Sequence, residues 1–252
     1  MTSGVKKILI LKLGSTFADL AGRCGDFENW IMNRSGLAPA CFQVLNATTG
    51  RALPDPADYL GVILTGSHDM VTDRRPWSEA IAAWIPTVMQ RRVPLLGICY
   101  GHQLIAHALG GRVGDNPNGM EMGAVRICLA EESGRHFIFK DLPGELMVIA
   151  CHTQSVLDLP PGAVRLASSA WDPYHAFAVG KTVWGVQFHP EFDARIMETY
   201  IHETAEALIR QGQHPDELIR ELGALSHAGS AVLERFCTFA LQRNMNESRS
   251  GS

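Results

Sequence analysis

The sequence of 252 residues has no apolar run that approaches the about 20 residues of a membrane-spanning helix. The N-terminal run Ile8-Leu9-Ile10-Leu11 lies between lysines and is too short for the core of a signal peptide. Positive charge is not in excess either, since the formal net charge is −4. We therefore expect a cytoplasmic protein that binds neither membranes nor nucleic acid.

Paired cysteines and metal-ligand spacings are also missing. The six cysteines form no regular framework and no Cys-x-x-Cys pair, so we expect them to be reduced and mostly buried. His102 and His107 follow Cys99 without a carboxylate or second cysteine at metal-ligand spacing. There is no Gly-x-x-x-x-Gly-Lys loop and no ATP-pyrophosphatase-like segment. The sequence predicts no metal, no organic cofactor and no synthetase module of its own.

The composition is that of a globular protein, 46% hydrophobic and 19% charged, and allows a sizeable core. In the first half, short apolar segments alternate with segments of helical periodicity, which predicts a parallel sheet with helices on both faces. The expected strands are 7–13, 41–45 and 61–64. A helix beginning at Pro76 should be kinked or split by Pro86.

The pattern changes in the second half. Over residues 112–187, short alternating segments with Gly and Pro turns predict a small antiparallel extension that returns to the sheet at 182–188. Residues 193–243 show helical periodicity and predict a C-terminal helical extension. We expect residues 1–243 to form a single domain and the polar segment 244–252 to be a disordered tail.

One cysteine lies in a setting typical of a catalytic nucleophile. Cys99 follows a short apolar run, has Gly97 and Gly101 two positions to either side, and precedes a helix-like pattern. Such a segment presents a nucleophile at a sharp strand-to-helix turn, where the start of the helix favours a thiolate. A cysteine between glycines also occurs by chance, so a second feature must supply the base.

That second feature is an apolar segment that ends in His189, with Glu191 two residues later. A cysteine nucleophile needs an imidazole to take its proton, and the imidazole needs a group that fixes its tautomer. Alternatively, His189 merely ends a strand and Glu191 is a solvated acid. Considered with the turn at Cys99, the pattern favours a triad of Cys99, His189 and Glu191.

Both motifs resemble the signatures of class I glutamine amidotransferases, most closely the amidotransferase domain of GMP synthetase and its stand-alone relatives. Four segments match in the family's order, and the resemblance covers about residues 6–200. They are Gly-Val-Ile-Leu-Thr-Gly-Ser-His-Asp (61–69), Gly-Ile-Cys-Tyr-Gly-His-Gln (97–103), Cys-His-Thr-Gln-Ser-Val with a later Leu-Pro (151–160), and Gly-Val-Gln-Phe-His-Pro-Glu (185–191). The resemblance implies a flavodoxin-like, three-layer α/β fold with a mostly parallel central sheet flanked by helices.

The resemblance also implies an oxyanion hole beside Cys99. One donor would be the backbone N–H of Tyr100, and the second would come from Gly66 or Ser67. The chain departs from the family here, because Gly66-Ser67-His68 replaces the usual Gly-Gly-Pro. A backbone donor survives this change if Ser67 has a negative φ. We expect His68 to line the rim without transferring protons.

Recognition of the substrate's head group is implied in the same way. The Gln103 side chain would contact the α-amino and carboxylate end of glutamine, although it could instead bond its own surroundings. The backbone at Thr153 and Gln154 would play a similar part, while His152 would have a structural, hydrogen-bonding role. The segment 116–123 matches a region that lies near the bound substrate in the family.

The sequence therefore predicts a hydrolase that releases ammonia from glutamine through a γ-glutamyl thioester on Cys99. The ammonia would pass to a separate synthetase subunit or acceptor enzyme. A second interpretation is a stand-alone γ-glutamyl hydrolase or peptidase that applies the same triad to another γ-glutamyl amide. A third is a non-catalytic binding relative, which the presence of all three triad residues disfavours.

Overall fold

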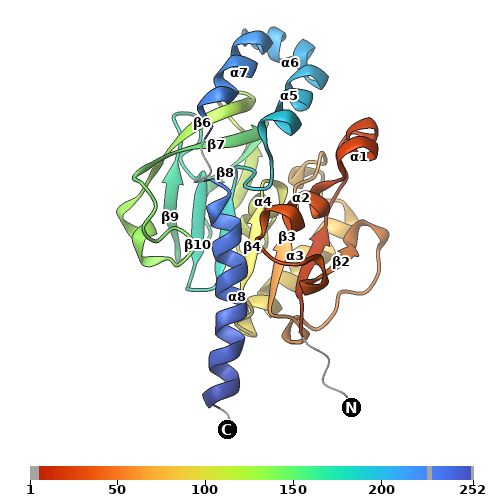
Figure 1. Cartoon of the computed structure of the whole chain (residues 1–252), viewed down its shortest axis with the longest axis vertical. Helices are drawn as coiled ribbons and strands as arrows, with labels where there is room; N and C mark the ends of the chain where they lie inside the picture. The colour runs from red at the N-terminus through yellow and green to blue at the C-terminus, as the bar shows by residue number, and fades with distance from the viewer. Residues whose placement is uncertain (1–5, 226–228, 251–252) are drawn as a thin grey trace.

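The fold is built on a nine-stranded sheet, seen in a computed structural model that describes residues 6–225 and 229–250 (Figure 1). The strand order is β2-β1-β3-β4-β11-β10-β9-β6-β7. The first five strands in this order are parallel. They are β2 (Phe42–Asn46), β1 (Ile8–Lys12), β3 (Gly61–Leu64), β4 (Leu95–Ile98) and β11 (Val183–Val186). Because parallel strands end at the same edge, the segments that follow β3, β4 and β11 meet there.

The remaining strands are antiparallel. Four of them continue the same sheet, namely β10 (Ala176–Val179), β9 (Ala163–Ser168), β6 (Glu121–Leu129) and β7 (Glu145–His152). A separate pair is formed by β5 (Arg112–Asp115) and β8 (Gln154–Asp158). The predicted fold class, an α/β sheet with an antiparallel extension and C-terminal helices, is confirmed.

Alternate residues of the parallel strands point to opposite faces of the sheet, and each set packs into its own hydrophobic core. Leu9, Leu11 and Leu64 pack with helices α3 (Pro76–Gln90) and α4 (Tyr100–Ala108). Ile8, Ile10 and Ile63 pack on the other face, with helices α2 (Phe27–Arg34) and α8 (Ala231–Ser250). This alternation produces the three-layer arrangement. None of the described helices is long and apolar enough to span a bilayer.

The structure excludes one alternative for Pro86 and differs from two other expectations. The cysteines are not mostly buried, since Cys24 and Cys128 are exposed and only Cys99 and Cys237 are buried. Pro86 does not split its helix, because α3 runs unbroken from Pro76 to Gln90; burial of Ile81, Ile85 and Val88 holds it on the sheet despite the hydrogen bond that proline removes. Helix α8 continues to Ser250 and so includes most of the segment 244–252 for which a disordered tail is expected. The sequence suggests that this helical segment begins near Ser226, which lies outside the described residues. In the structure, α8 begins at Ala231.

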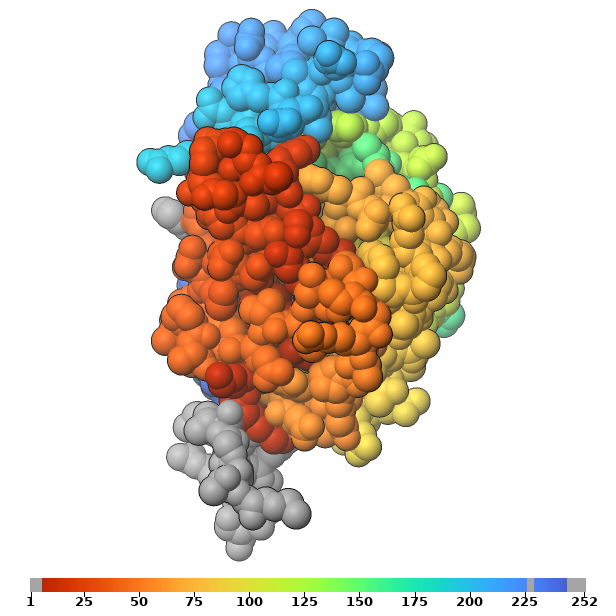
Figure 2. Space-filling view, turned by 90° about the vertical axis from the view of Figure 1, so that its right-hand side faces the viewer, coloured from red at the N-terminus to blue at the C-terminus, as the bar shows by residue number. Residues whose placement is uncertain are grey.

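A group of short helices covers the edge of the sheet where the parallel strands end. Helices α5 (Ala194–Glu203), α6 (Ala205–Arg210) and α7 (Pro215–Glu221), which we call the cap, gather at one end of the molecule (Figure 1). The cap meets the segment of α1 (Ala18–Cys24), coloured red beside the blue of the cap in Figure 2. Thr16 Oγ1 lies 2.8 Å from the Tyr200 hydroxyl, which joins the two segments.

Candidate active site

Cys99 lies at a strained turn between β4 and α4. Its φ of 49° and ψ of −99° place a residue with a side chain in the left-handed region that favours glycine. Such a turn at the end of a strand lifts the side chain out of the sheet and toward the space beyond it. The start of α4 then points its free backbone N–H groups toward the same space.

The two glycines around Cys99 are required by close packing. A Cβ atom on Gly97 would lie 2.4 Å from the backbone carbonyl carbon of Gly101, and one on Gly101 would lie 2.6 Å from the carbonyl oxygen of Leu64. Both distances are far below van der Waals contact. The glycines therefore let the first turn of α4 lie directly on the ends of β3 and β4.

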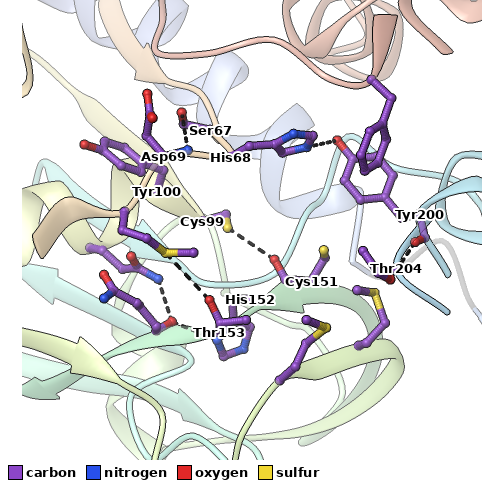
Figure 3. A pocket seen from close by; sticks show the side chains of 16 residues that line it. Ser67, His68, Asp69, Cys99, Tyr100, Cys151, His152, Thr153, Tyr200 and Thr204 are labelled. Carbon is purple, nitrogen blue, oxygen red and sulfur yellow. Dashed lines mark hydrogen bonds between the residues drawn. The ribbon is translucent and has the colours of Figure 1, made fainter. Parts of the chain in front are cut away.

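Strand pairing brings His189 beside this turn. Val186 of β11 is in register with Ile98 of β4, and the backbone N–H of Cys99 donates to the Val186 carbonyl at 2.9 Å. The segment after β11 carries His189 and is held by a bond from its backbone N–H to the Ile149 carbonyl of β7, at 2.8 Å. On the same strand, the Cys151 carbonyl oxygen lies 3.6 Å from the Cys99 sulfur (Figure 3).

The imidazole of His189 is paired with Glu191. Its Nδ1 donates to Glu191 Oε1 at 2.8 Å, and both side chains are almost fully buried. Burial lowers the pKa of His189, but the charges of Glu191 and Cys99, with hydrogen bonds to both, raise it to about 10. Because Nδ1 is occupied by Glu191, Nε2 is the nitrogen available to Cys99. The three side chains can therefore share and move one proton.

Aromatic packing fixes the orientation of the His189 ring. Phe192 stacks on it with ring centroids 4.1 Å apart, and Phe27 lies parallel to it at 6.3 Å. On another side, a Cβ atom on Gly66 would come within 3.0 Å of His189 Cε1. The glycine thus leaves room for the imidazole.

The expected oxyanion loop follows β3, and its residue Ser67 lines the cavity in which Cys99 lies. Ser67 is not among the described non-glycine residues with positive φ, so its backbone accommodates the departure from the family pattern. Its Oγ accepts a hydrogen bond from Asp69 N at 3.1 Å, and a Cβ atom on Gly14 would lie 2.5 Å from that Oγ. Tyr100 begins α4, as expected, and its hydroxyl bonds to Ser78 at 2.7 Å. The assignment of Gly66, Ser67 and Tyr100 as oxyanion donors stays a prediction.

The predicted head-group residues Gln103, Thr153 and Gln154 line the same cavity as Cys99. The Gln103 amide nitrogen, however, donates to the Gln154 carbonyl at 2.6 Å and to Gln187 Oε1 at 3.1 Å. Its two amide hydrogens are therefore used within the protein, as in the alternative role considered for it. Only its amide oxygen is left for a ligand, and a direct contact with the substrate stays a prediction.

His152 belongs to a buried polar cluster that sequence reasoning assembled only in part. Glu121 Oε2 accepts hydrogen bonds from His152 Nε2 at 2.9 Å and from His175 Nε2 at 3.1 Å, and its Oε1 accepts one from Ser169. Burial raises the pKa of Glu121, but the bonds from the two histidines hold it well below its usual range. The other ring nitrogen of His152 lies 3.0 Å from the Gln154 carbonyl oxygen, so the cluster supports the turn at Thr153.

Within the described residues, Glu121, His152 and His175 are also a group whose side chains could hold a metal ion. Glu121 Oε2 already has both histidine Nε2 atoms as hydrogen-bond partners, so these three atoms have partners without an ion. His175 has no motif around it, and no spacing in the sequence connects it to Glu121. Its position becomes apparent only when β6, β7 and the segment before β10 are packed together.

A cavity of about 270 Å³ opens beside Cys99 (Figure 3). Met120 and Met122 of the segment 116–123, expected near the substrate, line it. Another part of its lining comes from residues for which the sequence predicted no such place, namely Phe17, Met70, Cys151, Tyr200 and Thr204. His68 lines the cavity, and its Nε2 lies 3.1 Å from the Tyr200 hydroxyl. These residues come from segments far apart in the chain and share no pattern that marks them as neighbours.

Comparison with known proteins identifies a family and several similar sequences. Residues 26–205 match the family Glutamine amidotransferase class-I. The chain is 32% identical over 151 residues to gamma-glutamyl peptidase 3 of Arabidopsis thaliana, a match that covers 57% of this chain and 60% of the peptidase. It is 40% identical over 131 residues to a GMP synthase (glutamine-hydrolyzing) of Thermomicrobium roseum, covering 52% of this chain and 23% of the synthase.

A solved structure extends the likeness over nearly the whole chain. A glutamine amidotransferase from Thermotoga maritima aligns with a TM-score of 0.71 at 25% identity, covering 93% of this chain and 99% of that one. By sequence, the chain spans about 60% of the length of the plant peptidase and a smaller part of the synthase. The family match over residues 26–205 includes the turn at Cys99 and the pair of His189 and Glu191.

Proposed function

The chain belongs to the class I glutamine amidotransferase family, and from this we propose that it hydrolyses the γ-amide of glutamine or a γ-glutamyl compound. One observation carries the proposal. The strained turn at Cys99 lies beside the buried pair of His189 and Glu191, at the edge where parallel strands end. A thiol, a base and an oriented carboxylate in this arrangement suit attack on a carbonyl carbon.

The proposed reaction has two steps. His189, whose pKa is raised, takes the proton of the Cys99 thiol and so makes the sulfur the nucleophile. The sulfur attacks the γ-carbonyl carbon, the C–N bond breaks, and the departing nitrogen takes the proton from His189. Water, deprotonated by His189, then attacks the γ-glutamyl thioester and releases glutamate, and the proton returns to the pair.

The tetrahedral intermediate of each step carries a negative oxygen that needs hydrogen-bond donors. We propose the backbone N–H of Tyr100, at the start of α4, and an N–H from Gly66 or Ser67. Each donor of this kind stabilises a transition state by about 3 kcal/mol. The glutamyl head group would then lie against the turn at Thr153 and Gln154, supported by Gln103.

Ammonia is the product when the substrate is glutamine, and a separate synthetase subunit or acceptor enzyme would use it. Relatives named GMP synthase support this, since they are much longer than the matched part. A second candidate is γ-glutamyl hydrolysis of another amide, because a relative is named gamma-glutamyl peptidase and the cavity continues beyond Cys99. In either case we take residues 1–243 to act as one catalytic domain.

The test is covalent labelling and turnover of the full chain. A glutamine-analogue electrophile such as 6-diazo-5-oxonorleucine should modify Cys99, as located by peptide mass. Cys99→Ala should lose labelling at this position and at least about 10³-fold in glutamate release. Cys237→Ala is the matched control, since this buried cysteine lies in the core away from the cavity. Full turnover by Cys99→Ala would refute the proposal, and absence of both labelling and turnover would favour a binding relative.

A further inference from the structure

The cavity beside Cys99 has two ends of different chemistry. Figure 3 shows Asp69 and Tyr100 on one side of Cys99, and Tyr200 and Thr204 on the other. The first side adjoins the hydrogen-bonding residues proposed for the glutamyl head group. We call the other side the amine-side compartment. Its lining is Phe17, His68, Met120, Met122, Tyr200 and Thr204.

Aromatic contacts place this compartment on the side of His189. Phe192 stacks on His189 and also lies against Tyr200, with ring centroids 5.1 Å apart. The ring centroid of Phe27 lies 6.3 Å from that of His189 and 6.4 Å from that of His68. Because His189 gives its proton to the departing nitrogen, the group on that nitrogen must lie on this side. The amine-side compartment is therefore where the leaving group would be held.

The compartment combines apolar side chains with polar groups that already bond within the protein: His68 Nε2 lies 3.1 Å from the Tyr200 hydroxyl, and Thr204 Oγ1 donates to the Tyr200 carbonyl at 2.7 Å. Met122 and Tyr200 belong to the same buried apolar cluster, and Met120 and Phe17 pack against it. Among the described residues that line the whole cavity, none is Lys or Arg, and Asp69 is the one carboxylate. A carboxylate on the leaving group would meet no cation here, whereas thioether and aromatic groups contact apolar substituents well.

One wall of the compartment is held by the loop between α6 and α7 of the cap, which lies outside the part of the chain that matches the family. The match ends at residue 205, and the loop after α6 follows it. Gln211 Oε1 accepts from Met120 N at 2.8 Å, and Gln213 Nε2 donates to Met120 O at 2.7 Å. At Gly119, with a φ of +88°, a Cβ atom would lie 2.8 Å from Gln211 Oε1. Both backbone groups of Met120 are thus held by the cap.

From these observations we propose that the preferred substrate is a γ-glutamyl amide whose nitrogen carries an apolar substituent without a charged group. The inference rests on the proposed function and deepens it, by assigning the leaving group to the compartment formed by Met120, Met122 and Tyr200. Cys99 displaces the amine by forming the thioester, the amine leaves with the proton from His189, and water completes hydrolysis. The products are glutamate and the free amine.

The experiment compares three substrates with the purified full chain. They are glutamine, γ-glutamyl-glycine, whose leaving group carries a carboxylate, and γ-glutamyl-anilide, whose leaving group is apolar. Glutamate release gives kcat/KM for each. We expect γ-glutamyl-anilide to exceed both others by at least about 10-fold, since one apolar group in a fitting pocket is worth that factor or more.

A charge substitution tests where the selectivity resides. Met120→Arg should lower the ratio of kcat/KM for γ-glutamyl-anilide over γ-glutamyl-glycine by at least about 10-fold, because it gives the carboxylate a partner. Met89→Arg is the matched control, on an exposed methionine of α3 away from the cavity, and should leave the ratio unchanged. Where circular dichroism shows that Met120→Arg does not fold, Met120→Gln serves instead and should lower turnover of the anilide alone.

The outcomes separate the inference from the proposed function. Turnover of glutamine that depends on Cys99, without preference for the anilide, overturns the inference and leaves the function intact. A folded Met120→Arg protein with an unchanged ratio also overturns it. Failure to turn over all three substrates, with no labelling of Cys99, overturns both. A preference for the anilide that Met120→Arg reverses supports the inference.

Discussion

Nδ1 of His189 lies 2.8 Å from Oε1 of Glu191, inside a pair of side chains that solvent barely reaches. The carboxylate, acting with the Cys99 sulfur, outweighs the effect of burial and raises the pKa of the imidazole from its ordinary 6.5 to about 10. The bond also leaves only Nε2 to face the nucleophile. Protonation and orientation of His189 thus have one common cause, which can be tested by changing Glu191.

We expect kcat/KM of the wild-type protein to hold through neutral pH and to fall as pH rises through about 10. His189 loses its proton there and can no longer protonate the departing nitrogen. In Glu191→Gln the raising influence of the carboxylate is gone, so this alkaline fall should move toward the ordinary 6.5. The pH dependence of kcat/KM for glutamate release, measured for the wild-type protein and for Glu191→Gln, gives the position of the fall in each. An alkaline limb that is identical in the two proteins would contradict the role given to Glu191.

At its own optimal pH, Glu191→Gln should retain about 10⁻² to 10⁻⁴ of the wild-type kcat, because the amide no longer fixes the tautomer of His189. Labelling of Cys99 should slow in parallel. Glu198→Gln is a suitable control, since this exposed carboxylate of α5 lies 4.0 Å from the exposed His202. A variant of Glu191 with full kcat would show that another group orients the imidazole.

Gly97→Ala should be destabilised by about 1–3 kcal/mol, since the new methyl group would meet the Gly101 backbone at 2.4 Å. Activity should fall further than stability, because the turn that presents Cys99 must shift. Gly22→Ala is the matched control: it lies within α1 with open space around it and should gain up to about 1 kcal/mol. Urea unfolding of both variants measures the difference, and equal effects would argue against the packing account.

Glu121→Gln should lower the free energy of unfolding at neutral pH by about 3 kcal/mol, because two buried histidines lose their charged partner. The pKa of Glu121 is held below its ordinary 4.5, so its stabilisation is present above pH 4.5 and is lost as pH falls. Wild type should therefore lose stability on acidification more steeply than the variant. Glu145→Gln, from an exposed pair with Arg126, should cost less than about 1 kcal/mol.

The parts of the site that lie in short motifs were predictable from the sequence. Cys99 and His189 each follow an apolar segment, and such segments become neighbouring parallel strands whose ends must meet. The local glycine pattern likewise anticipated the turn at Cys99. These features depend on nearest neighbours in the chain, which the sequence displays directly.

The amine-side compartment was not predictable in the same way. Met120 belongs to the segment 116–123 expected near the substrate, but its approach to Tyr200 depends on how the cap docks against β6. The partnership of Glu121 with His175 likewise joins residues 54 positions apart without a motif. Pro86 does not split its helix, because burial of one helix face outweighs the loss of a single hydrogen bond.

Strand β7 is the last strand of the sheet, yet it contacts the proposed nucleophile and base and carries His152 at its end. Its Ile149 carbonyl holds the backbone of His189, its Cys151 carbonyl lies against the Cys99 sulfur, and its final residue is His152. A shift of this strand would therefore displace base, nucleophile and head-group turn in concert. Substitutions that shift this strand should therefore impair substrate binding and catalysis together rather than one of them alone.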